Sequence, residues 1–179
     1  IGSHTLEEMA DVKFEVVRRA RGAAILNADD PFCLAMAKRA NASRVCLVSS
    51  AENRELPGEA LGNVDSCVVE PEGGRAFIVI HDGATRIPLI AIDDIPATVA
   101  GAAGHNVSNA MHAAAACYFS GIDAAIIATA LRGFSMSFES TPGRLNIFEG
   151  LPFRVIMDYA HNADGFRRMC AFVDRLPVN

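Results

Sequence analysis

Two short apolar runs, each bounded by turn residues, constrain the fold of this chain most. The first is 23–27, the second is 44–49, and Asp29-Asp30-Pro31 lies between them. A helix can begin at Pro31, because the first turn of a helix does not need the amide hydrogen that proline lacks. Strand and helix connections in this order favour a parallel sheet covered by helices. The sequence therefore predicts an α/β fold.

Three helices are predicted around these strands. Thr5 followed three residues later by Glu8 has the pattern of a capping box, and apolar residues then recur at helical spacing as far as Gly22. An alanine-rich segment, 106–119, and a second segment, 123–131, form a predicted helix pair separated by Gly121.

Between Val64 and Ile92 the pattern changes to consecutive strands. The runs 75–80 and 85–90 are joined through His81-Asp82-Gly83-Ala84. An Asp-Gly pair between two such runs is a strong hairpin signal. We therefore expect an antiparallel β hairpin patch in addition to the parallel sheet.

A third apolar run, 154–157, leads into a polar turn that contains Asp158, His161 and Asn162, and the following segment, 164–176, has helical spacing. In open α/β folds, ligands bind at the carboxyl ends of strands. A carboxylate at such a turn can hold ribose hydroxyls, and an arginine nearby can hold phosphate. We therefore interpret this turn as part of a ligand site.

The composition is that of an ordinary soluble domain, with 51% hydrophobic and 21% charged residues. No apolar run is long enough for a membrane span, and the first residues lack the pattern of a signal peptide, so we expect a cytoplasmic protein without membrane contact. A net charge of −5 argues against nucleic acid as a partner. The five cysteines are far apart and lack metal-site spacing, which predicts reduced, mostly buried thiols.

The motif Asp158-Tyr-Ala-His-Asn162, with Pro142-Gly-Arg144 upstream, resembles the junction of the central and C-terminal domains in the Mur ligase superfamily. Longer stretches most closely resemble the Mur-ligase-like half of the cyanophycin synthetases: 95–98, 104–109, 138–148 and 155–162. The resemblance implies an ATP-dependent ligase that forms amide bonds through an acyl phosphate. It implies ATP and Mg²⁺ as cofactors, arginine and poly-aspartate as substrates, and allows homo-oligomers of the full-length enzyme.

The resemblance also implies a domain division. Residues 1–140 would be the latter part of a Mur ligase central domain, and 141–179 would begin the C-terminal domain. A glycine-rich phosphate loop ends in Gly-Lys-Thr or Gly-Lys-Ser, but the two lysines of this chain, Lys13 and Lys38, do not follow glycine. We expect that loop upstream of residue 1, and we expect the chain alone to be inactive.

Asn106 and Asn109 match an Asn-x-x-Asn pattern that lies beside the adenine in Mur ligases. Without the resemblance, asparagine at a helix start is explained by capping of exposed amides. Two nearby histidines, His105 and His112, are predicted to be packing or surface residues, because nothing pairs with them at metal-site spacing.

By the same analogy, Arg144 lies near the terminal phosphates and Asp158 binds the ribose. His161 and Asn162 would shape the same pocket, and Arg144 and His161 are the catalytic candidates. His161 could equally orient its neighbours without exchanging a proton. Ala163 replaces a proline that many relatives have here, which should loosen the turn before the last helix.

Lys13 precedes the 25–30 segment as a carbamylated lysine does in several Mur ligases. A carbamate would turn this cation into an oxygen ligand for Mg²⁺, but its formation needs a partly desolvated amine. The alternative is an ordinary solvent-facing charge on an amphipathic helix.

Two other interpretations stay open. One is a different ligase of the superfamily, such as a folylpolyglutamate synthase or a muramyl-peptide ligase. The other is a non-catalytic nucleotide-binding or scaffold module that has kept the fold.

Overall fold

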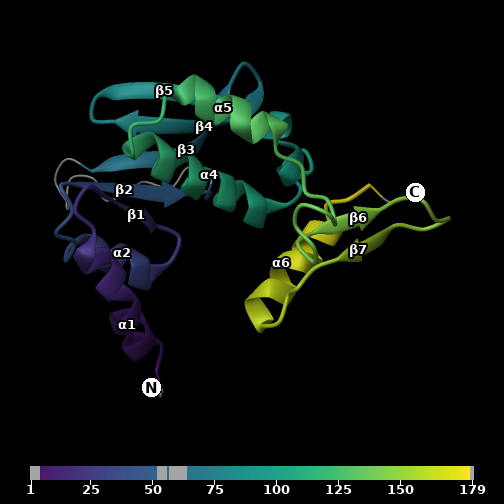
Figure 1. The fold of residues 1–179 in the computed structure, drawn as a ribbon, viewed down its shortest axis with the longest axis horizontal. Helices are drawn as coiled ribbons and strands as arrows, with labels where there is room; N and C mark the ends of the chain where they lie inside the picture. The colour runs from purple at the N-terminus through teal and green to yellow at the C-terminus, as the bar shows by residue number, and fades with distance from the viewer. Residues whose placement is uncertain (1–4, 52–55, 57–63, 178–179) are drawn as a thin grey trace.

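A five-stranded sheet of order β1-β2-β3-β4-β5 forms the centre of the computed structural model, which describes residues 5–51, 56 and 64–177 (Figure 1). Strands β1 to β3 are parallel, and β4 and β5 continue the sheet antiparallel to β3 and to each other. The predicted parallel sheet and hairpin patch are therefore one sheet, and the predicted α/β class is confirmed. The strand bounds are Ala23–Asn27, Arg44–Ser49, Asp65–Glu72, Arg75–Asp82 and Thr85–Ala91.

The hairpin between β4 and β5 turns at the predicted Asp-Gly pair. Asp82 pairs with Thr85 across the ladder, and Gly83 has a φ of 56°, a conformation that glycine adopts without steric cost. Both strands extend one or two residues beyond the predicted ranges, because the ladder continues to the turn and past Ile90.

Helices cover both faces of the sheet (Figure 1). On one side, helices α1 and α2 pack with Ala24 and Leu26 of β1. On the other side, helix α4 packs over β1 to β3 and helix α5 packs over β5. The helix bounds are Leu6–Arg19, Pro31–Ala37, Gly104–Phe119 and Ala124–Gly133. Two short 3-10 turns, η1 Ile92–Asp94 and η2 Pro96–Thr98, connect β5 to α4.

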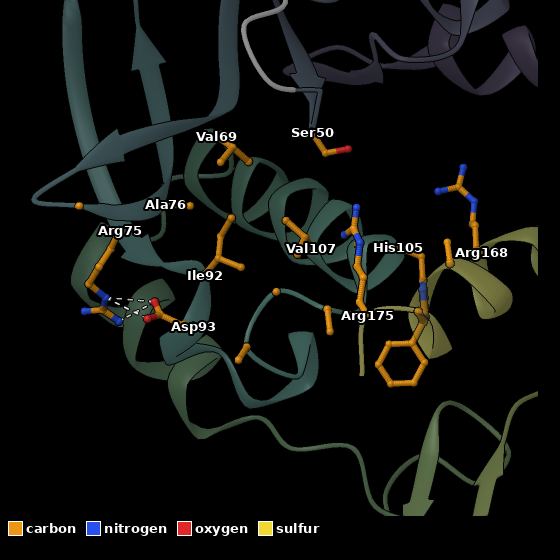
Figure 2. Close-up of a pocket in the computed structure, with 17 residues that line it drawn as sticks. Ser50, Val69, Arg75, Ala76, Ile92, Asp93, His105, Val107, Arg168 and Arg175 are labelled. Atoms are coloured by element: carbon orange, nitrogen blue, oxygen red, sulfur yellow. Dashed lines mark hydrogen bonds and ion pairs between the residues drawn. The ribbon is translucent and has the colours of Figure 1, made fainter. Parts of the chain in front are cut away.

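A large cleft lies beside the carboxyl end of β2, where Ser50 follows the strand (Figure 2). Its other walls come from η1, the start of α4 and one side of helix α6, Ala163–Val173. We call this hollow, of about 910 Å³, the α4–α6 cleft.

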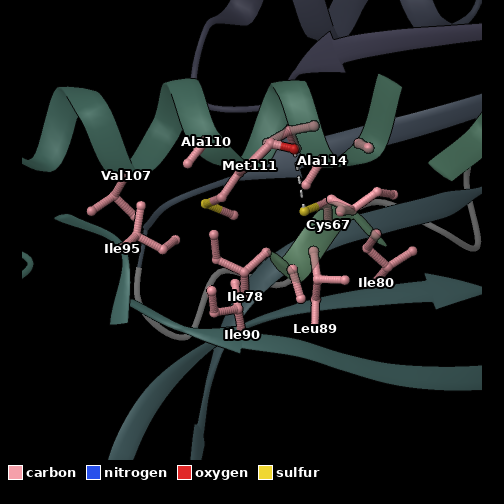
Figure 3. Packing of buried hydrophobic residues seen from close by; sticks show 14 of the residues in the cluster. Cys67, Ile78, Ile80, Leu89, Ile90, Ile95, Val107, Ala110, Met111 and Ala114 are labelled. Carbon is pink, nitrogen blue, oxygen red and sulfur yellow. Dashed lines mark hydrogen bonds between the residues drawn. The ribbon is translucent and has the colours of Figure 1, made fainter. Parts of the chain in front are cut away.

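The main core lies between the sheet and α4 (Figure 3). Met111 is fully buried and packs in one cluster with Ile78 and Ile90, while alanines on α4 let the helix approach the strands closely. The Cys67 thiol donates to the Met111 carbonyl at 3.6 Å, and burial raises the pKa of this thiol to about 12. All five cysteines are free, but only Cys46 and Cys67 are buried, so the thiols are less buried than predicted.

Helix α1 begins at the predicted capping box, with Thr5 Oγ1 accepting from the Glu8 amide at 3.1 Å. It ends at Arg19, three residues before Gly22. Its buried side chain is Phe14, whereas Leu6 and Val16 of the predicted apolar stripe are 68% and 75% exposed. The helical spacing of the apolar residues predicted the helix correctly. It did not indicate which side of the helix is buried, because α1 contacts the rest of the chain mainly through α2.

The last part of the chain forms a small separate sheet and a helix. Strands β6, Asn146–Phe148, and β7, Val155–Met157, pair antiparallel. Helix α6 follows and places Phe172 against Ala103 and Leu145. Residues 135–144 form no helix or strand, while the domain boundary at residue 140 stays a prediction. Among the described residues, no helix is long and apolar enough to span a bilayer.

Candidate functional site

An apolar groove runs between α4 and α5 and encloses about 500 Å³; we call it the α4–α5 groove. Alanines of α4 form its floor, and larger apolar side chains form its rim: Ile122, Ile126, Phe134 and Met136. Two of the predicted site residues, Asn106 and Asn109, line the same groove. A mostly apolar hollow with a few polar groups at one end is the usual build of a small-molecule site.

Asn106 is buried, and its amide is fully engaged. Its Nδ2 donates to the Ala97 carbonyl at 2.8 Å and to Met136 Sδ at 3.0 Å, while its Oδ1 accepts from Asn109 Nδ2 at 3.3 Å. Asn109 is exposed, and its Oδ1 has no partner among the described residues. Asn106 therefore shapes the groove wall, and Asn109 offers the available polar group.

The structure brings Arg144 and Asp158 together. The β6–β7 pairing places Asp158 next to the loop before β6, where its Oδ2 accepts from the Leu145 amide at 3.0 Å. Arg144 is exposed, with its guanidinium 5.7 Å from the Tyr159 ring centroid. A phosphate or carboxylate can therefore reach the Arg144 guanidinium from solvent.

His161 and Asn162 have local roles in the turn. Asn162 caps α6, with its Oδ1 accepting from the Gly165 amide at 2.8 Å. His161 is exposed, and its Nδ1 lies 3.0 Å from the Tyr159 carbonyl. This cap stabilises the first turn of α6, although Ala163 stands where many relatives are expected to have proline. The catalytic role of His161 stays a prediction.

Lys13 is exposed on α1 and lines neither the groove nor the cleft. An exposed amine is the environment of an ordinary charged lysine, whereas a carbamate needs desolvation. Within the described part of the chain, no group of three His, Cys, Asp or Glu side chains is placed to hold a metal ion. The Lys13 carbamate therefore stays a prediction.

His105 is a residue whose position the sequence did not reveal. Its Nδ1 is completely buried and has no hydrogen-bond partner among the described residues. Burial lowers the pKa of His105, the charge of Asp158 opposes this change, and the charge of Arg168 reinforces it. His105 lines the same cleft as Arg168 of α6. His112, in contrast, bonds only to the Ser108 carbonyl of its own helix, at 2.7 Å, as a packing residue would.

The groove and the Asp158 turn are connected through Met136. This side chain lines the groove and contacts Asn106, and it also packs on the cluster that contains Leu145. Leu145 donates its amide to Asp158. The residues selected from the α4 motif and from the Asp158 motif are therefore linked through side-chain and backbone contacts, while Arg144 and Asp158 do not themselves line the groove.

Comparisons with known proteins show which enzymes this chain is similar to. The chain is 33% identical to the cyanophycin synthetase of Geminocystis herdmanii over 97% of its length, and 33% identical to that of Synechocystis over 94%. A Gloeobacter violaceus UDP-N-acetylmuramoyl-L-alanyl-D-glutamate–2,6-diaminopimelate ligase is 31% identical over 83% of the chain. No protein-family model matches the chain.

The chain spans about a fifth of the length of the two synthetases and 26% of the Gloeobacter ligase. The chain is therefore a relative of one segment of the cyanophycin synthetases, within the Mur ligase superfamily.

Proposed function

We propose that this chain is part of an ATP-dependent ligase that joins an amino group to a carboxylate through an acyl phosphate, with arginine and poly-aspartate as substrates. The observation that carries the proposal is the series of contacts that links the α4–α5 groove to the Asp158 turn: Met136 lines the groove and packs on the cluster of Leu145, whose amide binds Asp158. The similarity to the cyanophycin synthetases supports the substrate pair.

The groove suits the base of a nucleotide. Its volume of about 500 Å³ and its apolar walls can enclose a flat ring, which gains from removal of apolar surface from water. Asn109 Oδ1 can accept a hydrogen bond from an exocyclic amine of the base. Asn106 keeps this end of the groove in shape through its bonds to Ala97 and Met136.

Arg144 and Asp158 suit the rest of the nucleotide. The exposed Arg144 guanidinium can bind a phosphate through two parallel hydrogen bonds. Only Oδ2 of Asp158 is occupied by Leu145, so its other oxygen can accept from a ribose hydroxyl. When bound, ATP supplies the phosphoryl group that activates a carboxylate. Arg144 would orient this phosphate and balance its charge.

The described residues do not by themselves fit Mg²⁺. Hard cations need several oxygen ligands, and no suitable group of three side chains occurs in the described ranges. The sequence also lacks a Gly-Lys-Thr or Gly-Lys-Ser phosphate loop. We therefore assign no step to Mg²⁺ here, and we expect the isolated chain to be catalytically inactive.

The proposal is tested in a longer protein that carries this chain and a phosphate loop. Arg144→Gln and Asp158→Asn should each lower ATP-dependent incorporation of labelled arginine into a poly-aspartate primer by roughly 100-fold or more, because a charge-stabilising contact is lost. Asp158→Asn keeps an acceptor for the Leu145 amide, so the fold should persist.

Arg154→Gln is the matched control. Arg154 lies on the same hairpin, pairs with Glu149 at 3.1 Å, and has no role in the proposed site. Its variant should keep normal incorporation. Near-normal activity of the Arg144 and Asp158 variants would contradict the nucleotide role of both residues.

The Gloeobacter match favours a second candidate, a muramyl-peptide ligase. ATP turnover by the longer protein can be compared with arginine and poly-aspartate and with diaminopimelate and UDP-N-acetylmuramoyl-L-alanyl-D-glutamate. Turnover only with the second pair would replace the proposed substrates. Binding of ATP without turnover of either pair would favour a non-catalytic module.

A further inference from the structure

Two arginines line one end of the α4–α6 cleft. Arg168 and Arg175 of the α6 region line this end beside His105, whereas Arg75 and Asp93 neutralise each other at the opposite end (Figure 2). None of the residues predicted from the sequence as site residues lines this cleft. The cleft is therefore a feature separate from the α4–α5 groove.

The two arginines keep donors available. The Arg175 guanidinium makes no hydrogen bond or ion pair with any described residue, and its Nη1 lies 3.6 Å from the position that a Cβ on Gly104 would occupy. Arg168 uses its Nε to bind Asp164 Oδ2 at 2.6 Å. Its terminal nitrogens keep four N–H donors, since a guanidinium has five in total.

The start of α4 faces the same end of the cleft. Gly104 and His105 line the cleft, the cap residue is Ala103, whose side chain makes no hydrogen bond, and the first turn has no acidic residue. The His105 amide has no acceptor among the described residues. The first turn of this 16-residue helix therefore carries no acidic side chain of its own at the positive end of the helix dipole, and the nearby acidic group is Asp158.

The His105 side chain indicates independently that a hydrogen-bond partner is missing from this end of the cleft. Its Nδ1 is buried beside the cleft and makes no hydrogen bond with the described residues. A buried polar atom without a partner is costly, and such atoms in native proteins usually bond to water, an ion or a ligand. Apolar side chains continue the wall from this point: Val69, Ile92 and Val107.

From these contacts we infer that the α4–α6 cleft binds a small organic anion, with its carboxylate or phosphate held by Arg168, Arg175 and the His105 amide at the start of α4. The apolar wall accommodates the neutral part of the ligand. The volume of the cleft, about 910 Å³, is in the range of the volumes of small-molecule sites. This site does not depend on the nucleotide role proposed for the groove.

The test uses the 179-residue chain with inorganic phosphate and succinate as separate probes at constant ionic strength. Each is titrated while the amide signals of Gly104 and His105 are followed by NMR. At least one probe should shift both signals saturably. Saturation by phosphate alone assigns a phosphate ligand, and saturation by succinate alone assigns a carboxylate.

Two variants and one control decide whether the cleft is responsible. Arg168→Gln and Arg175→Gln should each raise the dissociation constant roughly tenfold, because each removes a charge-assisted hydrogen bond. Arg167→Gln should not change it. Arg167 also pairs with Asp164, at 3.0 Å, but it is exposed and lies outside the cleft.

Two results would overturn the inference. The first is no saturation of either probe up to on the order of 10 mM. The second is an equal loss of affinity in the Arg167 variant, because that would show a response to the overall charge of α6 rather than to a site.

Discussion

Asn146 and Asp158 hold the loop that carries Arg144. Asn146 is 2% exposed; its Oδ1 accepts from the Gly143 amide at 2.7 Å, and its Nδ2 donates to the Thr141 carbonyl at 3.1 Å. Leu145 has a φ of 47°, a strained value for a leucine, and its amide bonds to Asp158. The position of Arg144 therefore depends on side chains on both sides of it.

Asn146→Ala should destabilise the chain, because it leaves the Gly143 amide without its partner and removes one of the two donors to the Thr141 carbonyl, the other being the Arg144 amide. We expect a loss of about 2 kcal/mol. For a chain of this size the melting temperature should fall by roughly 4–8 °C in a thermal scan. Asn109→Ala, at an exposed position, should shift it by less than about 2 °C. Equal shifts in both variants would show that the loop does not rely on Asn146.

Helix α6 is the element that joins the last part of the chain to the sheet domain. Asn162 fixes its first turn, and Phe172 is almost fully buried against Ala103 and Leu145. The main core between the sheet and α4 does not include Phe172. The attachment of α6 thus depends on a small cluster of its own.

Phe172→Ala should cost about 3–5 kcal/mol, because it removes a buried aromatic side chain and leaves a cavity. In hydrogen exchange, amides of α6 and of the β6–β7 hairpin should lose protection, whereas those of β3 to β5 should keep theirs. Phe166→Ala, on the same helix but at a 60% exposed position, is the control. Equal loss of protection throughout the chain would contradict the expectation that α6 and the β6–β7 hairpin are held by a cluster separate from the main core.

At the scale of the whole molecule, one charged network connects the sheet to α4. The Arg44 guanidinium binds Asp65 at 2.7 and 2.9 Å, also binds Asp82 of the hairpin turn, and lies 4.7 Å from the Phe119 ring centroid. Tyr118 donates its hydroxyl to Asp82 at 2.9 Å. The hydrogen bonds from Arg44 and then from Tyr118 lower the pKa of Asp82.

This lowered pKa makes stability depend on pH. A carboxyl whose pKa is lower in the folded state adds stability above its unfolded pKa, near 4, and loses it as the pH falls through the folded pKa. The urea midpoint should therefore decrease between about pH 5 and pH 3. Asp82→Asn should weaken this decrease, since it removes the titrating group and keeps acceptors for its partners. An unchanged pH dependence would rule out a contribution from Asp82.

Local sequence signals predicted the elements well. The Thr5 capping box, the Asp-Gly turn and Pro31 each lie where a helix begins or a hairpin turns. These signals succeed because a cap or a tight turn involves only residues within four positions of one another. The apolar stripe on α1 misled, because periodicity shows that a helix has an apolar side but not what covers it.

The sequence by itself determined the α/β class, most of the helices and strands, and the two motifs that mark a relative of the Mur ligases. Only the tertiary structure decided that Met136 connects the groove to the Asp158 turn, and that Arg175 lies across the start of α4. The physical reason is distance along the chain. Gly104 and Arg175 meet because the packing of Phe172 on Ala103 and Leu145 holds α6 against α4, and no local pattern encodes that contact.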